Sequence, residues 1–581
     1  MKLYNYITIM ALSSILIFNA CDEYEEAPIE RFTIDYVFSK TDSLGDKAQK
    51  YLNTIYYAMD NGHNRVGNDY LDAASDDAVS SSLSETSVYR LSTGQYTSSN
   101  LVGGEMEWGK YYTAIRQANT FILYIDDVPL MAKFINANND TLPMTSVWKA
   151  EARFLRAYFY FELLKRYGGI PIVRDVPYEV KDDMEIPRNS FKDCVQYIMD
   201  ELDLAVDSLR TAPLEDPGGT GHVVTQGAAR ALQCRLLLYA ASPLFNERPI
   251  ENNNPLIGYL SYDPERWKTA ADSARSFMNT WKGIYTLGRQ FNGTFLNDYS
   301  NNYKEVIFFR QGSRSQSIEK INGPLGFSGT NQSTGQTSPT QNLVDAFPML
   351  DGKAISDPTS KYNYSSSSQS MYDNRDPRLN YTVLHNGSSW LNKTLETYAG
   401  GAHNPTSATQ TTKTSYYMRK FMGSFEKVDN YADELHVWIL FRYAEILLNF
   451  AEAQNEYAGA SSEVYQAVID LRKRAGIEAG NDNLYGLKAG MTKDEMREII
   501  RNERRIEMAF EEQRYWDIRR WRTAEEIFKQ PLYGLSIANS SGLLTFSRTP
   551  VASISFDPKR YLYPIPYAEV IKNRNMVQNP E

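Results

Sequence analysis

The chain has 581 residues and a formal net charge of −10, and no block of Lys and Arg interrupts this acidic balance. An acidic chain of this kind argues against a nucleic acid as the partner. Beyond the N-terminal segment, no apolar run approaches the ~20 residues needed to cross a membrane. We therefore expect a soluble body, long enough for one large domain or two ordinary ones.

The N-terminal segment has the pattern of a lipoprotein signal peptide. Lys2 precedes an apolar run over 7–18, which is too short for a membrane-spanning helix but suits the core of a signal peptide. Cys21 follows directly after the small residue Ala20. We expect residues 1–20 to be removed and Cys21 to carry acyl chains, which are sufficient for stable anchoring. The alternative is an ordinary signal peptide with an incidental Cys.

Helical patterns dominate the first half of the chain and return near its end. The segment 147–167 is apolar nearly all round, which predicts a central helix, and Gly168-Gly169 with Pro171 should end it. In 195–209 the apolar residues follow a helical period. Further helical patterns cover 44–60, 107–126, 225–241, 264–281, 438–456, 463–475 and 493–522.

Only two cysteines follow Cys21, and both fall in helical patterns. Cys194 and Cys234 are best explained as small buried residues, not as a disulfide framework. A single bridge between them in an oxidising compartment stays open.

The character of the sequence changes between 283 and 436. Gly, Ser, Asn and Thr become frequent, 306–311 has the composition of a strand, and 326–342 and 362–374 are typical of loops. An insert of this length with so many loops is usually functional or disordered. Its aromatic residues favour an ordered surface, so we expect one compact body, mainly α, with a loop-rich, partly β subdomain laid on a helical scaffold.

The segment 501–521, RNERRIEMAFEEQRYWDIRRW, mixes charged and large apolar residues densely. Its basic residues are all Arg, whose planar guanidinium groups suit fixed, partly buried pairing with carboxylates. Residues of opposite charge three positions apart can meet on one helical surface; these pairs are Arg504/Glu507, Glu511/Arg514 and Arg514/Asp517. Structural ion pairing explains the segment, so we assign it to the scaffold.

The sequence contains no constellation typical of an enzyme. Its five His lie far apart, and no HExxH, CxxC, GxSxG or GxxxxGK spacing occurs. The carboxylate pairs Asp76-Asp77 and Asp126-Asp127 could serve a glycosidase, but turns and helix caps explain them more simply. We expect no catalytic residue, no metal site and no cofactor.

Aromatic residues point to binding. The chain has 41 Tyr, 25 Phe and 8 Trp, and sugar C–H faces lie well on aromatic rings while Tyr hydroxyls reach the sugar hydroxyls. Aromatic residues on helices should be core, so those in polar loops are the candidates. In the insert they are Phe327, Trp390, Tyr416 and Tyr417. Trp390 could either stack on a sugar or fill the interior of the subdomain.

Five blocks of the sequence resemble one family in that family's order. They are RFLRAYFYFELLKRYGGIPIV (153–173), ALQCRLLLYAASPLFN (231–246), RYAEILLNFAEAQNE (442–456), the segment 501–521, and YLYPIPYAEVIKNRNMVQNP (561–580). Together they resemble the SusD/RagB family of outer-membrane nutrient-binding lipoproteins, nearly from end to end. The chain departs from the family at Pro580-Glu581, where relatives often continue with Gly and an aromatic residue.

The resemblance implies a fold and a division of the chain. It implies a tetratricopeptide-like scaffold of helical hairpins, although no internal period is visible in the sequence. After a signal peptide at 1–20, we expect a helical scaffold over 21–282, the loop-rich subdomain over 283–436, and a C-terminal helical part over 437–581. The acidic residues behind Cys21 resemble the signal that places such proteins on the outer leaflet, facing the medium.

The resemblance also implies a function. It is the capture of an oligosaccharide or polysaccharide and its delivery to a SusC-like TonB-dependent transporter, with oligopeptide capture as the alternative. A surface hydrolase and a purely structural scaffold are the more distant alternatives. Because relatives build part of their ligand surface from the region 64–104, its candidates are Asp77, Arg90, Tyr96 and Asn100. Asp77 could instead cap a helix.

Overall fold

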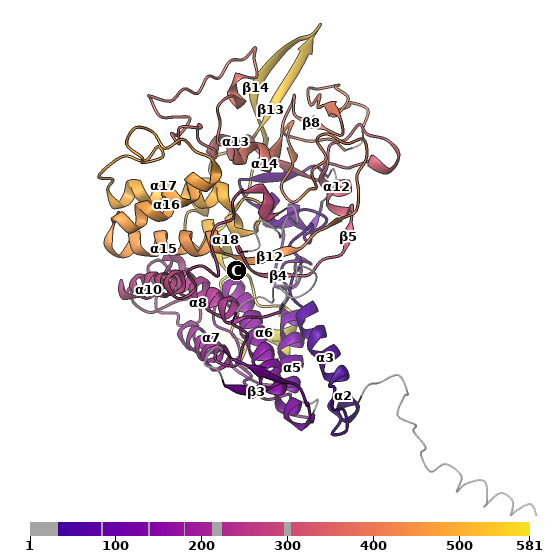
Figure 1. Cartoon of the computed structure of the whole chain (residues 1–581), viewed down its shortest axis with the longest axis vertical. Coiled ribbons are helices and arrows are strands. Elements are labelled where there is room, and N and C mark those ends of the chain that lie inside the picture. The colour runs from indigo at the N-terminus through magenta and orange to yellow at the C-terminus, as the bar shows by residue number, and fades with distance from the viewer. Residues whose placement is uncertain are drawn as a thin grey trace, which may run out of the picture.

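The computed structural model describes residues 33–82, 85–136, 140–178, 181–211, 223–295, 304–408 and 410–581. The expected signal peptide and Cys21 lie outside the described residues. Helices form the lower and left parts of the molecule in Figure 1, and loops with short strands form its upper right.

The helical body is a stack in which each helix packs on the next. Its N-terminal members are α3 (Asp46–Tyr57), α5 (Trp108–Tyr124), α6 (Met144–Tyr167), α7 (Phe191–Val206), α8 (Gln226–Ala241) and α10 (Glu265–Thr280). Helix α10 then packs on α15 (Tyr443–Ala458), which contacts α16 (Ser462–Ala475) and α17 (Lys493–Glu507). Segments far apart in sequence thus form one continuous stack (Figure 1), which confirms the mainly α fold.

Helix α6 lies at the centre of this stack, as its apolar pattern predicts. It contacts α5 on one side and α7 on the other, and most of its side chains are buried. The helix ends at Gly168, whose φ is +76° and whose Cβ position would lie 2.5 Å from the carbonyl oxygen of Leu256. Only Gly fits there, since other residues disfavour this φ and the added carbon would collide with the backbone.

Two predicted helices are wrong in part. Residues 438–442 form the strand β12 (Trp438–Arg442), antiparallel to β4 (Val306–Arg310), and helix α15 begins only after it. All five strand residues are buried, and periodicity cannot separate a short buried strand from a helix. The predicted helix over 493–522 breaks between α17 and α18 (Gln513–Arg520), where Phe510 and Glu512 have φ of 62° and 60°.

The remaining elements are short, apart from one hairpin. The two-stranded antiparallel sheets pair β1 (Ala78–Ser80) with β6 (Thr337–Pro339), β2 (Lys133–Ile135) with β3 (Thr141–Pro143), β5 (Arg314–Ser315) with β11 (Glu434–Leu435), β7 (Val383–Leu384) with β10 (Tyr417–Met418), β8 (Ser389–Trp390) with β9 (Lys393–Thr394), and β13 (Leu532–Ser540) with β14 (Leu543–Ala552). The short helices are α2 (Ile34–Val37), α4 (Ser87–Thr93), α9 (Pro243–Asn246), α12 (Ser317–Asn322), α13 (Gln341–Ala346), α14 (Arg378–Thr382), α19 (Ala524–Ile527) and α20 (Tyr567–Lys572). The hairpin β13–β14 projects from the loop-rich end (Figure 1).

One core of buried apolar residues runs from the helices into the insert. This continuity agrees with the expectation of one compact body. The boundaries proposed at 282/283 and 436/437 stay a prediction, since the core crosses both of them. Cys194 and Cys234 are buried free thiols in this core, and burial raises the pKa of each to about 12.

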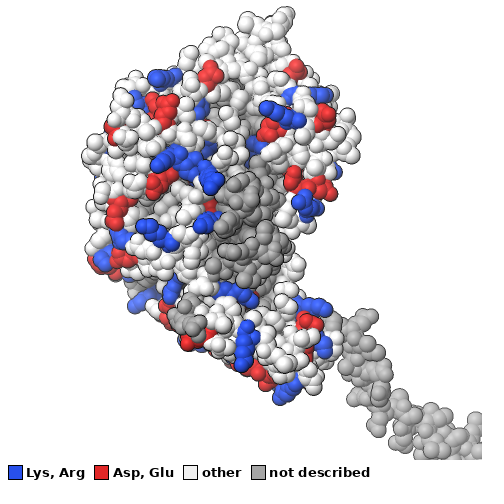
Figure 2. Space-filling view, in the orientation of Figure 1, with Lys and Arg blue, Asp and Glu red and all other residues white. Residues whose placement is uncertain are grey.

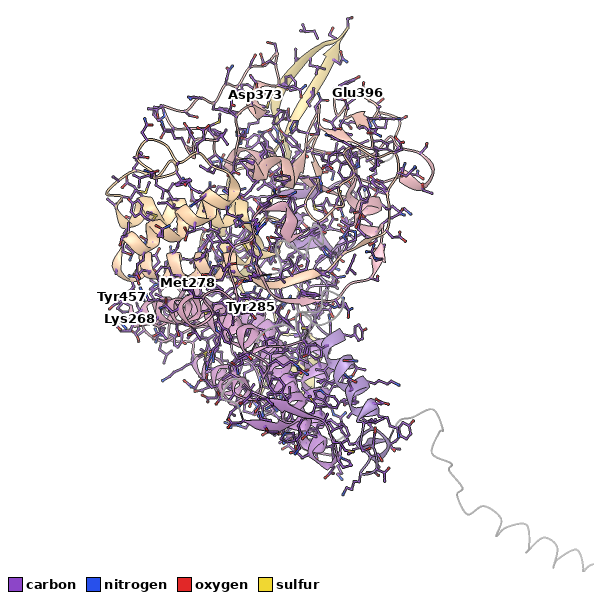
Figure 3. All side chains as sticks on the ribbon, in the orientation of Figure 1. Lys268, Met278, Tyr285, Asp373, Glu396 and Tyr457 are labelled. Carbon is purple, nitrogen blue, oxygen red and sulfur yellow. The ribbon has the colours of Figure 1, made fainter. Side chains whose placement is uncertain are left out.

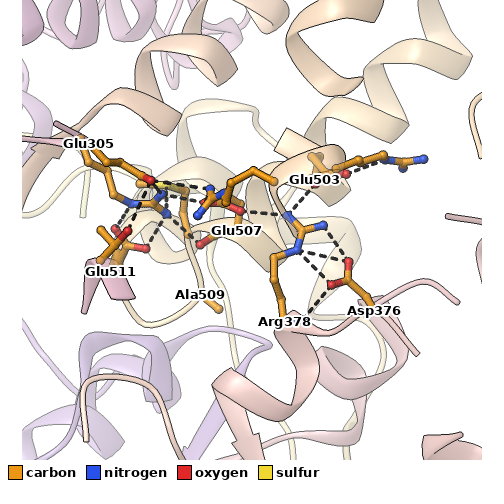
Figure 4. A network of polar contacts seen from close by, with 12 residues as sticks. Glu305, Asp376, Arg378, Glu503, Glu507, Ala509 and Glu511 are labelled. Carbon is orange, nitrogen blue, oxygen red and sulfur yellow. Dashed lines mark hydrogen bonds and ion pairs between the residues drawn. The ribbon is translucent and has the colours of Figure 1, made fainter. Parts of the chain in front are cut away.

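A buried network of ion pairs joins the insert to the helical body (Figure 4). Its charged members are Glu305, Asp376, Arg378, Lys420, Arg442, Arg472, Arg474, Glu503, Glu507 and Glu511. At its centre Glu507 of α17 accepts hydrogen bonds from Arg378 of the insert, at 2.9 Å, and Arg442 of β12, at 2.7 Å. Burial acts to raise the pKa of Glu507, but the surrounding guanidinium groups hold it well below its usual range.

The ion pairs predicted within 501–521 are wrong, although the scaffold role agrees with the burial of these residues. Arg504 pairs with Asp517 at 2.8 Å, and Arg514 pairs with Asp76 at 2.7 Å. Glu511 accepts from Arg442 at 2.7 Å. The break between α17 and α18 removes the regular spacing only for Glu511 and Arg514. The other two predicted pairs each lie within one helix, and their side chains pair with residues elsewhere in the fold instead.

Among the described residues no helix is long and apolar enough to cross a membrane. Figure 2 shows Lys and Arg interspersed with Asp and Glu over the visible face. That face therefore presents no broad basic area of the kind that binds nucleic acid.

Candidate functional site

Asp77, a candidate from the region 64–104, is buried in an ion pair. Its carboxylate accepts a hydrogen bond of 2.6 Å from Arg505, and the neighbouring Asp76 is bound by Arg514. Asp77 precedes strand β1 and no helix, so the alternative that it caps a helix is wrong. These contacts join the region 64–104 to the segment 501–521. They leave the Asp77 side chain with no exposed surface.

Tyr96 is also buried, with only 5% of its side chain exposed. Its ring meets the edge of Tyr563 at 5.9 Å, and the guanidinium of Arg560 lies 5.3 Å from its centroid. Neither ring face is open in this structure. The expectation that Tyr96 presents a ring to a ligand is therefore corrected, because the C-terminal segment covers it.

Arg90 and Asn100 stay near the surface and lie together. The Arg90 guanidinium donates to the carbonyl oxygen of Asn100 at 2.8 Å and to that of Gln95 at 3.2 Å. These bonds fix the guanidinium, while the Asn100 side chain is exposed. The pair stays a candidate for polar contacts with a ligand.

Three of the four candidates in the insert are interior residues. The Trp390 indole N–H donates to the Tyr431 hydroxyl at 2.9 Å, and the Tyr416 hydroxyl donates to Gln341 at 2.6 Å. The Tyr417 hydroxyl donates to the carbonyl oxygen of His403. All three rings are buried, which corrects the expectation that they are exposed on loops. The chain folds back over them and satisfies their polar atoms, and for Trp390 the interior role holds.

Phe327 is the insert candidate that reaches the surface, where its ring is half-buried. It lies 4.9 Å from the ring of His403, and the Lys393 ammonium lies 5.8 Å from its centroid. Glu396 is exposed nearby, on the loop-rich upper part of the molecule (Figure 3). We name the residues Phe327, Lys393, Glu396 and His403 the Phe327 platform.

The Phe327 platform is fixed from below. His403 Nδ1 accepts the backbone N–H of Glu396 at 3.0 Å, and its carbonyl oxygen accepts from the buried Tyr417. Burial lowers the pKa of His403, so this imidazole is neutral at pH 7. The result is a rigid aromatic surface with one cation and one carboxylate at its rim, which can receive a sugar face and its hydroxyls.

Structural contacts hold the two loop regions against each other. Strand β1 pairs with β6, so Ala78 lies opposite Pro339. Beside them Asp69 accepts hydrogen bonds from Gln336 and Thr337, yet burial raises its pKa to about 7. Within the described part of the chain, no hydrogen bond, ion pair or ring contact joins the Arg90–Asn100 pair to Phe327.

Sequence reasoning missed Lys393, Glu396 and His403. They lie far from Phe327 in the sequence, and each is an ordinary residue of a polar loop. No periodic or motif signal marks them, since only the folding of the insert brings them to Phe327.

Three of the four carboxylates singled out as possible glycosidase residues pair with cations. Asp76 and Asp77 are held by Arg514 and Arg505, and Asp126 pairs with Lys149. Within the residues that the structure describes, no group of His, Cys, Asp and Glu could hold a metal ion.

Two family models match this chain. The model of the SusD family matches residues 304–581, and one described as "Starch-binding associating with outer membrane" matches residues 36–238. SusD-like protein P38 of Formosa agariphila is 22% identical over 553 residues, which cover 91% of this chain and 93% of that protein.

Solved structures share the fold over nearly the whole length. A SusD-like protein from Bacteroides fragilis matches with a TM-score of 0.73 and 26% identity, covering 95% of this chain and 99% of that one. A SusD-like carbohydrate binding protein from the same species matches with a TM-score of 0.71 and 22% identity, covering 92% and 99%. The two family models together cover residues 36–238 and 304–581, and the chain belongs to the SusD/RagB family.

Proposed function

We propose that this protein binds an oligosaccharide or polysaccharide at the cell surface and delivers it to a SusC-like TonB-dependent transporter in the outer membrane. It is anchored there by acyl chains on Cys21 and carries out no chemistry on the glycan. The family models support a role at the outer membrane, and one similar structure is described as carbohydrate-binding.

The observation that carries the proposal is the Phe327 platform. A half-exposed aromatic ring that rests on a neutral imidazole offers a flat apolar face. The exposed Lys393 ammonium can donate to sugar hydroxyls. The exposed Glu396 carboxylate, one oxygen of which accepts the N–H of Ala402 at 3.3 Å, can accept from them. Delivery requires a reversible contact of modest affinity, because a glycan held too tightly would not be released. A single half-buried ring suits such a contact.

The test is calorimetry on the protein lacking residues 1–21, titrated with a panel of polysaccharides, their oligosaccharides and peptide digests. We expect saturable binding to a glycan. Phe327→Ala should weaken it by about tenfold, which corresponds to ~1.4 kcal/mol and is the size of one aromatic contact. The matched control is Tyr381→Ala, which removes another exposed aromatic residue of the insert, 39% exposed in α14.

The possible outcomes separate the alternatives. Glycan binding that Phe327→Ala weakens and Tyr381→Ala does not supports the proposal. Binding of peptides alone would replace the glycan with an oligopeptide as the cargo. Turnover of a glycan would identify a surface hydrolase, and no binding by any member of the panel would reject capture altogether.

A further inference from the structure

A second pocket lies in the helical body, on a different set of elements from the Phe327 platform. Its volume is about 200 Å³, and its walls come from α3, the first turns of α6 and the end of β4. Three aromatic residues line it, namely Tyr56, Tyr57 and Trp148. Tyr57 is 68% exposed at its mouth and Trp148 only 7% exposed, so the aromatic surface extends from solvent inward.

The polar groups on the floor of this pocket carry no net charge and are already paired with one another. Glu151 pairs with Arg210 and accepts a hydrogen bond of 2.8 Å from the Tyr56 hydroxyl. That hydroxyl in turn accepts the backbone N–H of Val224 at 3.1 Å. Because Glu151, Arg210 and Tyr56 are held by these contacts, they form the wall of the pocket. Contacts with a ligand are left to the other lining residues.

The remaining polar groups of the pocket lack protein partners. The side-chain amides of Gln49, Asn53 and Gln311 are exposed at its edge, and no described residue bonds them. Arg310, at the end of β4, has a buried Nε with no hydrogen-bond partner and forms no ion pair within the described part of the chain. A buried donor left unbonded is destabilising. Arg310 therefore provides an uncompensated positive charge where a ligand can reach it.

We propose that this pocket is a second carbohydrate site, which takes one sugar ring bearing a carboxylate or a sulfate. The aromatic rings suit the sugar face, the amides suit its hydroxyls, and a guanidinium pairs best with a planar or tetrahedral oxyanion. At about 200 Å³ the pocket has room for a ligand the size of one sugar ring. The inference rests on the proposed function, since it assumes that the protein's cargo is a glycan.

The charge balance of the lining favours an anionic sugar over a neutral one. Glu151 and Arg210 cancel, so Arg310 leaves the pocket with one net positive charge. The chain as a whole is acidic, at −10, whereas the lining of this pocket is positive. A carboxylate or sulfate on the sugar supplies the counter-charge that Arg310 lacks among the described residues.

The experiment titrates the protein lacking residues 1–21 with short oligogalacturonates, sulfated galactan oligosaccharides and neutral oligosaccharides of equal length. We expect one of the anionic series to bind, and Arg310→Gln to weaken it at least tenfold. Tyr57→Ala should weaken the same ligand several-fold, and this exposed residue can be changed without disturbing the core. The matched control is Arg230→Gln, which removes an arginine that pairs with Asp203 on α7, on the surface of the helical body.

The outcomes distinguish this inference from the proposed function. Binding of an anionic oligosaccharide that is weakened by Arg310→Gln and Tyr57→Ala, but not by Phe327→Ala or Arg230→Gln, supports the second site. Comparing the sulfated oligosaccharides with the oligogalacturonates shows whether the site takes a sulfate or a carboxylate. Anionic ligands that bind the Arg310→Gln and Tyr57→Ala variants as tightly as the original protein would overturn the second site. Glycan binding that depends on Phe327 alone would also overturn it and leave the proposed function intact.

Discussion

The helical body and the loop-rich insert are held together by different means. In the body, apolar side chains recur along each helix, and each helix packs against its neighbour in the stack. In the insert, the strands are mostly two or three residues long, and side chains far apart in sequence make the connections. Trp390 bonds Tyr431 and Tyr416 bonds Gln341. Order in the insert thus depends on particular polar contacts, whereas order in the body depends on a repeated apolar face.

The buried ion-pair network of Figure 4 is where the two regions meet. Arg378 of the insert reaches Glu503 and Glu507 of α17 at 2.7 and 2.9 Å. Ion pairs this deeply buried add little net stability over an apolar packing, but a single unpaired member is strongly destabilising. The network should therefore determine how the insert is placed on the body more than how stable the body is.

The largest effect should come from breaking this network at its centre. Glu507→Gln removes the charge that faces Arg378, Arg442 and Arg474, all of them buried. Arg378 and Arg442 keep other carboxylates, but the loss of the one charge that all three guanidinium groups share leaves the buried network with an excess positive charge. This should reduce the free energy of unfolding by about 3–5 kcal/mol. Urea unfolding followed by circular dichroism measures this. A loss below ~1 kcal/mol would show that the insert is held by other contacts.

The control for Glu507→Gln lies on the same helix. Glu498 forms an exposed pair with Arg501 at 3.6 Å, so Glu498→Gln should change stability by less than about 1 kcal/mol. The pH dependence offers a second readout. Because the pKa of folded Glu507 is held below its unfolded value, its contribution is present above about pH 5 and is lost as the pH falls towards its folded pKa. The Glu507→Gln variant should lose less stability than the original protein over that range.

A smaller loss of stability should distinguish a residue in the interior of the insert from one on its binding surface. Trp390→Phe removes the bond to Tyr431 and part of a fully buried ring, which should reduce the free energy of unfolding by about 2 kcal/mol. Glycan affinity measured by calorimetry should stay unchanged, the reverse of the pattern for Phe327→Ala. A fall in affinity with unchanged stability would place Trp390 in the binding surface after all.

The sequence predicted the helical body well because its signal is periodic. The central helix over 147–167 follows from its apolar pattern, and Gly168 ends it as expected. The errors fall where a local pattern is ambiguous. The apolar run over 438–442 fits a buried strand and a helix equally well. Nothing in the local sequence of 508–512 shows that the helix ends there and that Glu511 pairs with Arg442 and Lys420.

The candidate site could be predicted only in part, for a related reason. Loop composition identified the insert, but it could not tell an aromatic ring that points inward from one that points outward. Trp390 and Phe327 both lie among small polar residues, yet the first is fully buried and the second half-buried. The difference arises from contacts with distant residues such as Tyr431 and His403, which no window of sequence contains.

The smallest effect should arise in the helical body, where a local change ought to stay local. Helix α17 starts with a capping box, in which the Thr492 hydroxyl accepts the N–H of Glu495 and the Glu495 carboxylate accepts the N–H of Thr492. Thr492→Ala should reduce the free energy of unfolding by about 1 kcal/mol, while Thr492→Ser, which keeps the hydroxyl, should leave it nearly unchanged. The same helix carries Glu503 and Glu507 into the network, so the size of the effect is informative. Urea unfolding could instead show a loss well above 1 kcal/mol for both the body and the insert. The first turn of α17 would then help to hold the network in place, and the two regions would be less independent than their contacts indicate.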